Sequence, residues 1–168
     1  MKKIILAIIA GIIPLVLPAA STDFWFRHFS VEDGLSSNSV RAIMQDKYGF
    51  MWLGTDDGLN RYDGTTIKVY NLNPQGSNDY ISSLYDTTDN IWVGTEGGVY
   101  IFDYETESFE LFKVLTAQGD SIKSNVNHIA EDRDGNLWFS TVGQGIFKYN
   151  ISKHYLEHYE FKDANGLM

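Results

Sequence analysis

The stretch "DGNLWFST" at residues 134–141 decides the fold, because close versions of it occur twice earlier in the chain. These are "YGFMWLGT" at residues 48–55 and "DNIWVGT" at residues 89–95. The tryptophans at their centres, Trp52, Trp92 and Trp138, are spaced by 40 and 46 residues. A repeat of this length predicts stacked supersecondary units, and it fits a four-stranded propeller blade.

Other residues recur at fixed distances from each tryptophan. An Asp precedes it by six residues, a Thr follows it by three, and a Gly with an aromatic residue four positions later comes next. We expect the Asp to accept backbone N–H bonds of a turn, and the two kinds of Gly to allow a close approach or a positive φ. The repeat positions are Asp46, Trp52, Gly54, Thr55, Gly58 and Tyr62, then Asp86, Trp92, Gly94, Thr95, Gly98 and Phe102, then Asp132, Trp138, Thr141, Gly145 and Tyr149.

Each unit divides at turn signals into four short runs, which predicts four strands. The second run is apolar almost without alternation, as at residues 50–53, so both of its faces must be covered. The fourth run alternates, as at Ile67 and Val69, which is typical of a half-exposed strand. A β-sandwich would show alternation in most strands. The expected fold is therefore all-β: a partial β-propeller of about three four-stranded blades plus one N-terminal closing strand.

The ends of the chain give the expected boundaries. Residues 1–20 have the layout of a signal peptide, with Lys2 and Lys3 before an apolar run that is interrupted by Pro14 and too short to span a bilayer. The segment "DFWFRHFSVEDGL" at 23–35 matches "YLEHYEFKDANGL" at 155–167, so we expect an outer, ring-closing strand at 23–34. Blades are expected at 35–76, 77–122 and 123–161, and residues 162–168 would begin a further blade. Such an N-terminal fragment would expose two aromatic-rich blade faces.

Composition argues against several functions. The formal net charge of −9 disfavours contact with nucleic acid, and the absence of cysteine excludes disulfides. His154 and His158 are about 13 Å apart in a strand, too far to share one metal ion, and "DRDGN" at 132–136 lacks the other ligands of a calcium loop. No metal, cofactor or catalytic residue is predicted, although the acidic pair Asp56 and Asp57 leaves a propeller lyase or glycosidase open.

Residues 29–70 resemble the two-component regulator propeller repeat. The resemblance depends on "DGLSSN" followed by the spaced set "I..D..G..W.GT..GL.RYDG". It implies a periplasmic sensor segment of a hybrid two-component histidine kinase and response regulator. Such parents are anchored in the inner membrane, are expected to be homodimers, and typically sense oligosaccharides to control genes for glycan use. The chain itself shows no kinase nucleotide motif.

Ligands of propellers usually meet the loops that enter the first strand and those that join the second to the third. An envelope protein-interaction module is a third interpretation, beside the oligosaccharide sensor and the polysaccharide-degrading enzyme. The candidate binding residues in and near these loops are Trp25, Ser37, Asn38, Arg41, Asp56, Asp57, Asn78, Tyr80, Glu96, Asn125, Asn127 and Gln144.

Overall fold

The computed structural model describes residues 26–72 and 80–160. The predicted signal peptide, the predicted start of a further blade at 162–168 and the candidate residues Trp25 and Asn78 lie outside these ranges. Among the described residues, no helix is long and apolar enough to cross a membrane.

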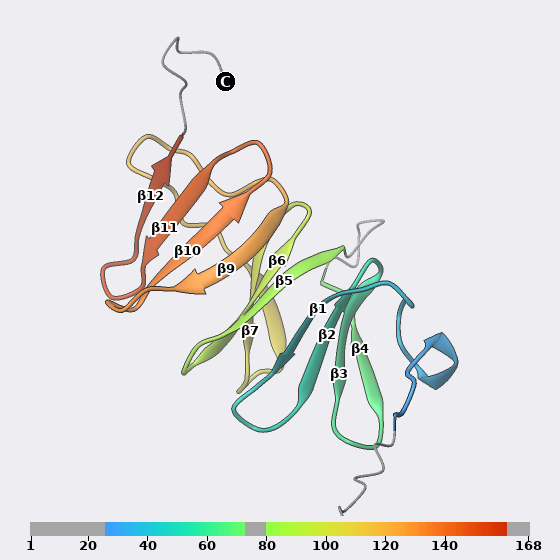
Figure 1. The fold of residues 1–168 in the computed structure, drawn as a ribbon. Helices are drawn as coiled ribbons and strands as arrows, with labels where there is room; N and C mark the ends of the chain where they lie inside the picture. The colour runs from blue at the N-terminus through green and yellow to red at the C-terminus, as the bar shows by residue number, and fades with distance from the viewer. Residues whose placement is uncertain (1–25, 73–79, 161–168) are drawn as a thin grey trace, which may run out of the picture.

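In the described parts of the chain, twelve strands form three four-stranded antiparallel sheets, and they confirm the strands expected from the repeat (Figure 1). Each sheet follows chain order, so each is one blade. Blade 1 contains β1 (Val40–Gln45), β2 (Met51–Thr55), β3 (Gly58–Tyr62) and β4 (Ile67–Tyr70). Blade 2 contains β5 (Ile81–Asp86), β6 (Asn90–Thr95), β7 (Gly98–Asp103) and β8 (Ser108–Leu111). Blade 3 contains β9 (Val126–Glu131), β10 (Asn136–Thr141), β11 (Ile146–Asn150) and β12 (Tyr155–Tyr159).

The blades are arranged as an open fan, with the first strands of neighbouring blades side by side. β1 lies beside β5, and β5 lies beside β9 (Figure 1). Burial follows the expected gradient: five of the six residues of β6 are buried, whereas β8 is mostly exposed. The second strand of the middle blade, β6, is covered by blades 1 and 3 on its two faces, as a propeller requires.

The glycines beside the tryptophans allow the close approach that the sequence predicts. A Cβ on Gly54 would lie 2.5 Å from Cγ2 of Ile81, and a Cβ on Gly94 would lie 2.9 Å from the carbonyl oxygen of Val126. Both neighbours belong to the first strand of the next blade. Glycine is therefore needed where one blade's second strand meets the next blade's first strand.

The repeated tryptophan fills the space between blades. Trp52 is fully buried, and its ring lies 5.1 Å from that of Phe102 in blade 2. Trp92 is 4% exposed and packs against Phe139 and Tyr149 of blade 3. Trp138 lies on the outer face of blade 3, where it is only partly buried and stacks with Tyr159. The exposed Ile43 and Val69 lie on the opposite end face, on blade 1. Both ends of the fan thus present apolar side chains.

The prediction for the repeated Asp is confirmed in blades 1 and 3. One oxygen of Asp46 accepts the backbone N–H groups of Tyr48 and Phe50, and the other accepts the indole N–H of Trp52 at 2.7 Å. Asp132 bonds its own turn and Trp138 in the same way.

In blade 2 the prediction for Asp86 is wrong, because the β5–β6 hairpin is one residue shorter. The closing backbone bond joins Thr87 to Asn90, whereas Asp46 and Phe50 form it in blade 1. Thr87 therefore occupies the place of the repeated Asp, and Asp86 accepts bonds from the backbone of Lys47 and the hydroxyl of Tyr104 instead. The indole N–H of Trp92 is left buried without a hydrogen-bond partner among the described residues.

The described part of the predicted closing strand, residues 26–34, contains no strand, because residues 26–30 are in no β-ladder and Val31–Asp33 form a 3-10 helix. A β-ladder forms through backbone hydrogen bonds with a neighbouring strand, whereas this segment contacts blade 1 through its side chains. The ring of Phe29 lies 4.8 Å from that of Tyr62, and the guanidinium of Arg27 covers Phe29 and bonds the Tyr62 hydroxyl. The segment leads into a 3-10 helix, Val31–Asp33, which is closed by Gly34 at a φ of 108°.

Candidate functional site

One end of the fan gathers the two kinds of loop that the sequence singled out. In each blade, a backbone bond joins the turn after the second strand to the residue that enters the first strand: Asp56 to Ser39, Glu96 to Tyr80, and Val142 to Asn125. The repeated Thr stabilises the same turn, since its hydroxyl donates to the carbonyl of the repeated Gly in all three blades. Both loop types therefore lie at one edge of every blade.

A β-bulge re-aims a side chain at this edge of each blade. The ladder between the first and second strands shifts between Val40 and Ala42, between Ile81 and Ser83, and between Val126 and His128. The extra residues are Arg41, Ser82 and Asn127. Bulges often turn a side chain toward a functional position. Arg41 and Asn127 were predicted from the sequence, whereas Ser82 was missed.

Arg41, Asp56 and Tyr80 form a compact cluster at the junction of blades 1 and 2. The guanidinium Nε of Arg41 donates to Oδ1 of Asp56 at 2.6 Å, and Nη2 donates to Oδ2 at 3.2 Å. The guanidinium carbon lies 5.6 Å from the centroid of the Tyr80 ring. The side chain of Arg41 is 50% exposed and that of Asp56 is 33% exposed, so a ligand can reach both.

The cluster stays charged over the physiological pH range. The hydrogen bond from Arg41 holds the pKa of Asp56 below its usual value, and the hydrogen bond to Asp56 raises the pKa of Arg41. A guanidinium has five N–H donors, and two of those of Arg41 bind Asp56. A planar donor and acceptor pair beside an aromatic face can bind hydroxyl groups of a ring-shaped ligand.

Among the described residues, the structure does not bring the other predicted binding residues into this cluster. The side chains of Ser37 and Asn38 accept backbone N–H groups of the N-terminal loop, from Ser39 and Val31. The side-chain amide of Gln144 accepts the backbone N–H of Lys123 and donates to the backbone carbonyl of Ser121. Asp57, Glu96 and Asn127 are exposed, and Oδ1 of Asn125 is buried without a partner among the described residues.

His154 and His158 make contacts within blade 3. Nδ1 of His154 bonds the hydroxyl of Tyr149, and the ring of His158 stacks on Phe147 at 4.1 Å. Across the described residues, no group of three His, Cys, Asp or Glu side chains is placed to hold a metal ion.

Parts of blades 1 and 3 match a family model, that of the two-component regulator propeller, over residues 34–57 and 121–143. These two segments thus resemble the two-component regulator propeller repeat. The first match runs from the loop before β1 to the turn after β2, and the second covers the corresponding part of blade 3.

Solved structures of extracellular domains resemble this chain. The extracellular domain of the putative hybrid two-component system BT3049 from B. thetaiotaomicron aligns with a TM-score of 0.72 and 30% identity over 84% of this chain. That of the putative one component system BT4673 from the same organism aligns with a TM-score of 0.65 over 80% of this chain, but its 23% identity supports the fold alone.

A curated histidine kinase is also similar to this chain in sequence. The protein called Histidine kinase P4, from Formosa agariphila, is 46% identical over 70 residues, which are 42% of this chain and 5% of the relative. The chain likewise spans only 21% of the BT3049 domain. The repeat is therefore of the type found in extracellular sensor regions of hybrid two-component systems, and it corresponds to a small part of them.

Proposed function

We propose that this chain is a periplasmic ligand-sensing segment of a hybrid two-component histidine kinase and response regulator, and that it recognises an oligosaccharide. The parent would be anchored in the inner membrane and act as a homodimer. Its remaining blades and signalling domains would be the partners of this segment, and the output would be transcription of genes for glycan use.

The observation that carries the proposal is the Arg41–Asp56–Tyr80 cluster on a fold otherwise found in extracellular domains of two-component systems. An oligosaccharide presents adjacent hydroxyl groups on a ring with apolar faces. The free N–H groups of Arg41 would donate to one hydroxyl, Asp56 would accept from its neighbour, and Tyr80 would cover the sugar face. Because the side chains come from both sides of the junction of blades 1 and 2, an occupied site would also connect the two blades.

Binding and turnover should be measured together on the protein that contains these blades. Isothermal titration calorimetry with a panel of neutral oligosaccharides, followed by mass spectrometry of the ligand, tests both. We expect saturable binding without products. Arg41→Ala and Asp56→Asn should each weaken binding by about tenfold or more, since each removes a charge-assisted hydrogen bond.

Arg133→Ala is the matched control, because Arg133 is an exposed arginine in the β9–β10 turn, at the other end of its blade. Its affinity should equal that of the unmodified protein. The appearance of shortened or unsaturated products would favour a propeller glycosidase or lyase. No binding to any member of the panel would favour a module for protein contact in the cell envelope.

A further inference from the structure

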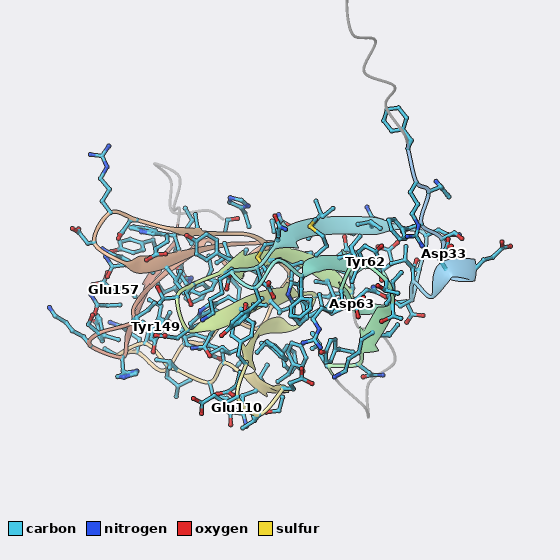
Figure 2. The ribbon with its side chains drawn as sticks, turned by 90° about the horizontal axis from the view of Figure 1, so that it is seen from below. Asp33, Tyr62, Asp63, Glu110, Tyr149 and Glu157 are labelled. Atoms are coloured by element: carbon cyan, nitrogen blue, oxygen red, sulfur yellow. The ribbon has the colours of Figure 1, made fainter. Side chains whose placement is uncertain are left out.

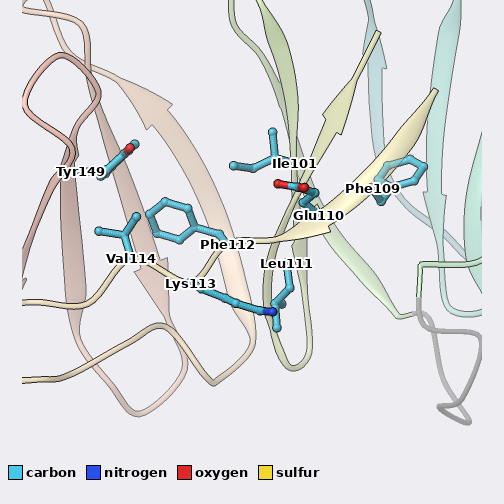
Figure 3. Close-up of a pocket in the computed structure, with 8 residues that line it drawn as sticks. All are labelled: Ile101, Phe109, Glu110, Leu111, Phe112, Lys113, Val114 and Tyr149. Atoms are coloured by element: carbon cyan, nitrogen blue, oxygen red, sulfur yellow. The ribbon is translucent and has the colours of Figure 1, made fainter. Parts of the chain in front are cut away.

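A cavity of about 670 Å³ opens at the perimeter of the fan, between blades 2 and 3. It lies at the opposite side of the blades from the inner strands, beside β8 and the segment that follows it. Figure 3 shows Ile101 and Glu110 on one side, with Phe112, Val114 and Tyr149 on the other. Most of the lining side chains are thus apolar or aromatic, and the carboxylate of Glu110 is directed into the space between them.

The equivalent place in the other two blades contains a cation. Each repeated tryptophan has a cross-strand partner in the third strand: Arg61 for Trp52, and Lys148 for Trp138. The guanidinium of Arg61 lies 5.7 Å from the Trp52 ring, and the amino group of Lys148 lies 5.1 Å from the Trp138 ring. In blade 2 the partner of Trp92 is Ile101, which has no charge.

The junction of blades 1 and 2 shows how such a cation is held. Arg61 lies over the rings of Phe50 and Tyr70, and it bonds the carboxylate of Glu107 in blade 2 at 2.9 Å. Lys68, the cross-strand neighbour of Arg61, bonds the other oxygen of Glu107. The side chain of Arg61 is only 17% exposed. A buried guanidinium with a carboxylate partner therefore fills the perimeter of this junction.

At the junction of blades 2 and 3 the aromatic walls and a carboxylate are present, but Ile101 replaces the cation. Phe112 is the structural equivalent of Tyr70. Tyr70 pairs with Leu59 and Phe112 donates its backbone N–H to Val99, and these two partners each lie seven residues after the tryptophan of their blade. Glu110 is the cross-strand neighbour of Ile101, where blade 1 has Lys68. His154 takes the turn position of Glu107, with nearly the same positive φ, and bonds the hydroxyl of Tyr149.

From this comparison we infer that the cavity is a binding site for a flat organic cation, such as a guanidinium or amidinium group. The cation takes the place of the missing arginine side chain. It lies against Phe112 and Tyr149 and forms an ion pair with Glu110, whose cross-strand neighbour Ile101 has no charge. Lys113 does not take this place, because its amino group points toward Leu111 and away from Tyr149 (Figure 3).

A pair of probes that differ only in charge tests the inference. Benzamidinium and benzamide have the same shape, and both can be titrated into the protein while the methyl signals of Ile101 are followed by NMR. We expect benzamidinium to bind about tenfold more tightly than benzamide, because a cation–π contact and a charge-assisted bond add to the shared apolar contact. The Ile101 methyl signals should shift on binding.

Three variants locate the site. Glu110→Gln should remove the preference for the charged probe, whereas Glu105→Gln, at an exposed carboxylate in the β7–β8 turn, should keep it. Ile101→Arg should restore the blade 1 arrangement and block both probes. Equal affinity for the two probes, no binding of either, or a preference that survives Glu110→Gln would each overturn the inference, and Glu110→Gln decides the matter even where Ile101→Arg does not fold.

Discussion

Replacing Asp46 by Ala should strongly destabilise the junction of blades 1 and 2. The carboxylate accepts the indole N–H of Trp52 at 2.7 Å and the backbone N–H groups of Tyr48 and Phe50 at 2.9 Å each. Trp52 is fully buried, so its N–H cannot turn to water when the acceptor is removed. The bonds from the backbone N–H groups of Tyr48 and Phe50 are both partly buried, so water can replace them only in part.

The size of the effect follows from these three bonds. A buried donor left without a partner costs about 1–3 kcal/mol, and loss of the two partly buried backbone bonds, which water replaces in part, adds roughly 1 kcal/mol. The total is about 3 kcal/mol, which lowers Tm by about 6–12 °C for a domain of this size. Asp46→Asn keeps an acceptor oxygen without the charge, and we expect it to lose about half as much.

Thermal unfolding followed by circular dichroism measures the effect, and hydrogen exchange of the Trp52 indole N–H locates it. The matched control is Asp89→Ala, which removes an exposed carboxylate from the corresponding turn of blade 2. The indole N–H should exchange slowly in the control and quickly in Asp46→Ala. If the two variants melted at the same temperature, with equal protection of the indole, the buried bond would not contribute to stability and the reasoning would fail.

Three further predictions concern the same repeat positions. Thr87→Asp should raise the free energy of unfolding by about 1 kcal/mol, because it offers the buried indole of Trp92 the acceptor that blades 1 and 3 supply; unchanged exchange of that indole would contradict this. Gly94→Ala should cost about 1–3 kcal/mol in urea denaturation, since the new Cβ meets the backbone of Val126, whereas Gly97→Ala meets open space and should be nearly neutral. Bonds from Trp138 and Asn136 hold the pKa of Asp132 well below its usual range. The stabilising effect of the ionised carboxylate should therefore be complete above about pH 5 and decline as the pH falls below about 4. The difference in Tm between the unmodified protein and Asp132→Asn should shrink on acidification. A difference that did not depend on pH would show that ionised Asp132 does not stabilise the fold.

The sequence predicted the blades well because their signals are local and repeated. The apolar second runs reflect packing between blades. The Gly residues of blades 1 and 2 reflect a close approach to the next blade, and the Asp–Trp spacing reflects a bond that forms in blades 1 and 3. Asp86 shows the limit of this reasoning: it has the correct distance from Trp92, but the shortened hairpin moves it out of the equivalent structural place. The six-residue spacing between Asp86 and Trp92 does not show how many of the intervening residues belong to the β5–β6 turn.

The candidate site could be predicted only in part. The loops at one end of the fan follow from blade topology, and Arg41, Asp56 and Tyr80 were among the residues that they contain. Ser82 was missed because a bulge leaves little trace in one sequence, although a polar residue follows the first apolar residue of all three first strands, as "VR", "IS" and "VN". The perimeter cavity could not be foreseen, since it depends on comparing facing side chains of two blades.

The shortened hairpin of blade 2 has a consequence for how such repeats diverge. Because the turn is one residue shorter, Asp86 lies one position beyond the cross-strand partner of Trp92, and its side chain is on the opposite face of the sheet from that indole. Its carboxylate accepts the backbone N–H of Lys47 in the preceding blade and the hydroxyl of Tyr104 in its own blade. Insertions and deletions in these turns can therefore replace a hydrogen bond within one blade by a hydrogen bond between two blades. An alignment that places Asp86 in the same column as Asp46 and Asp132 would compare residues with different partners.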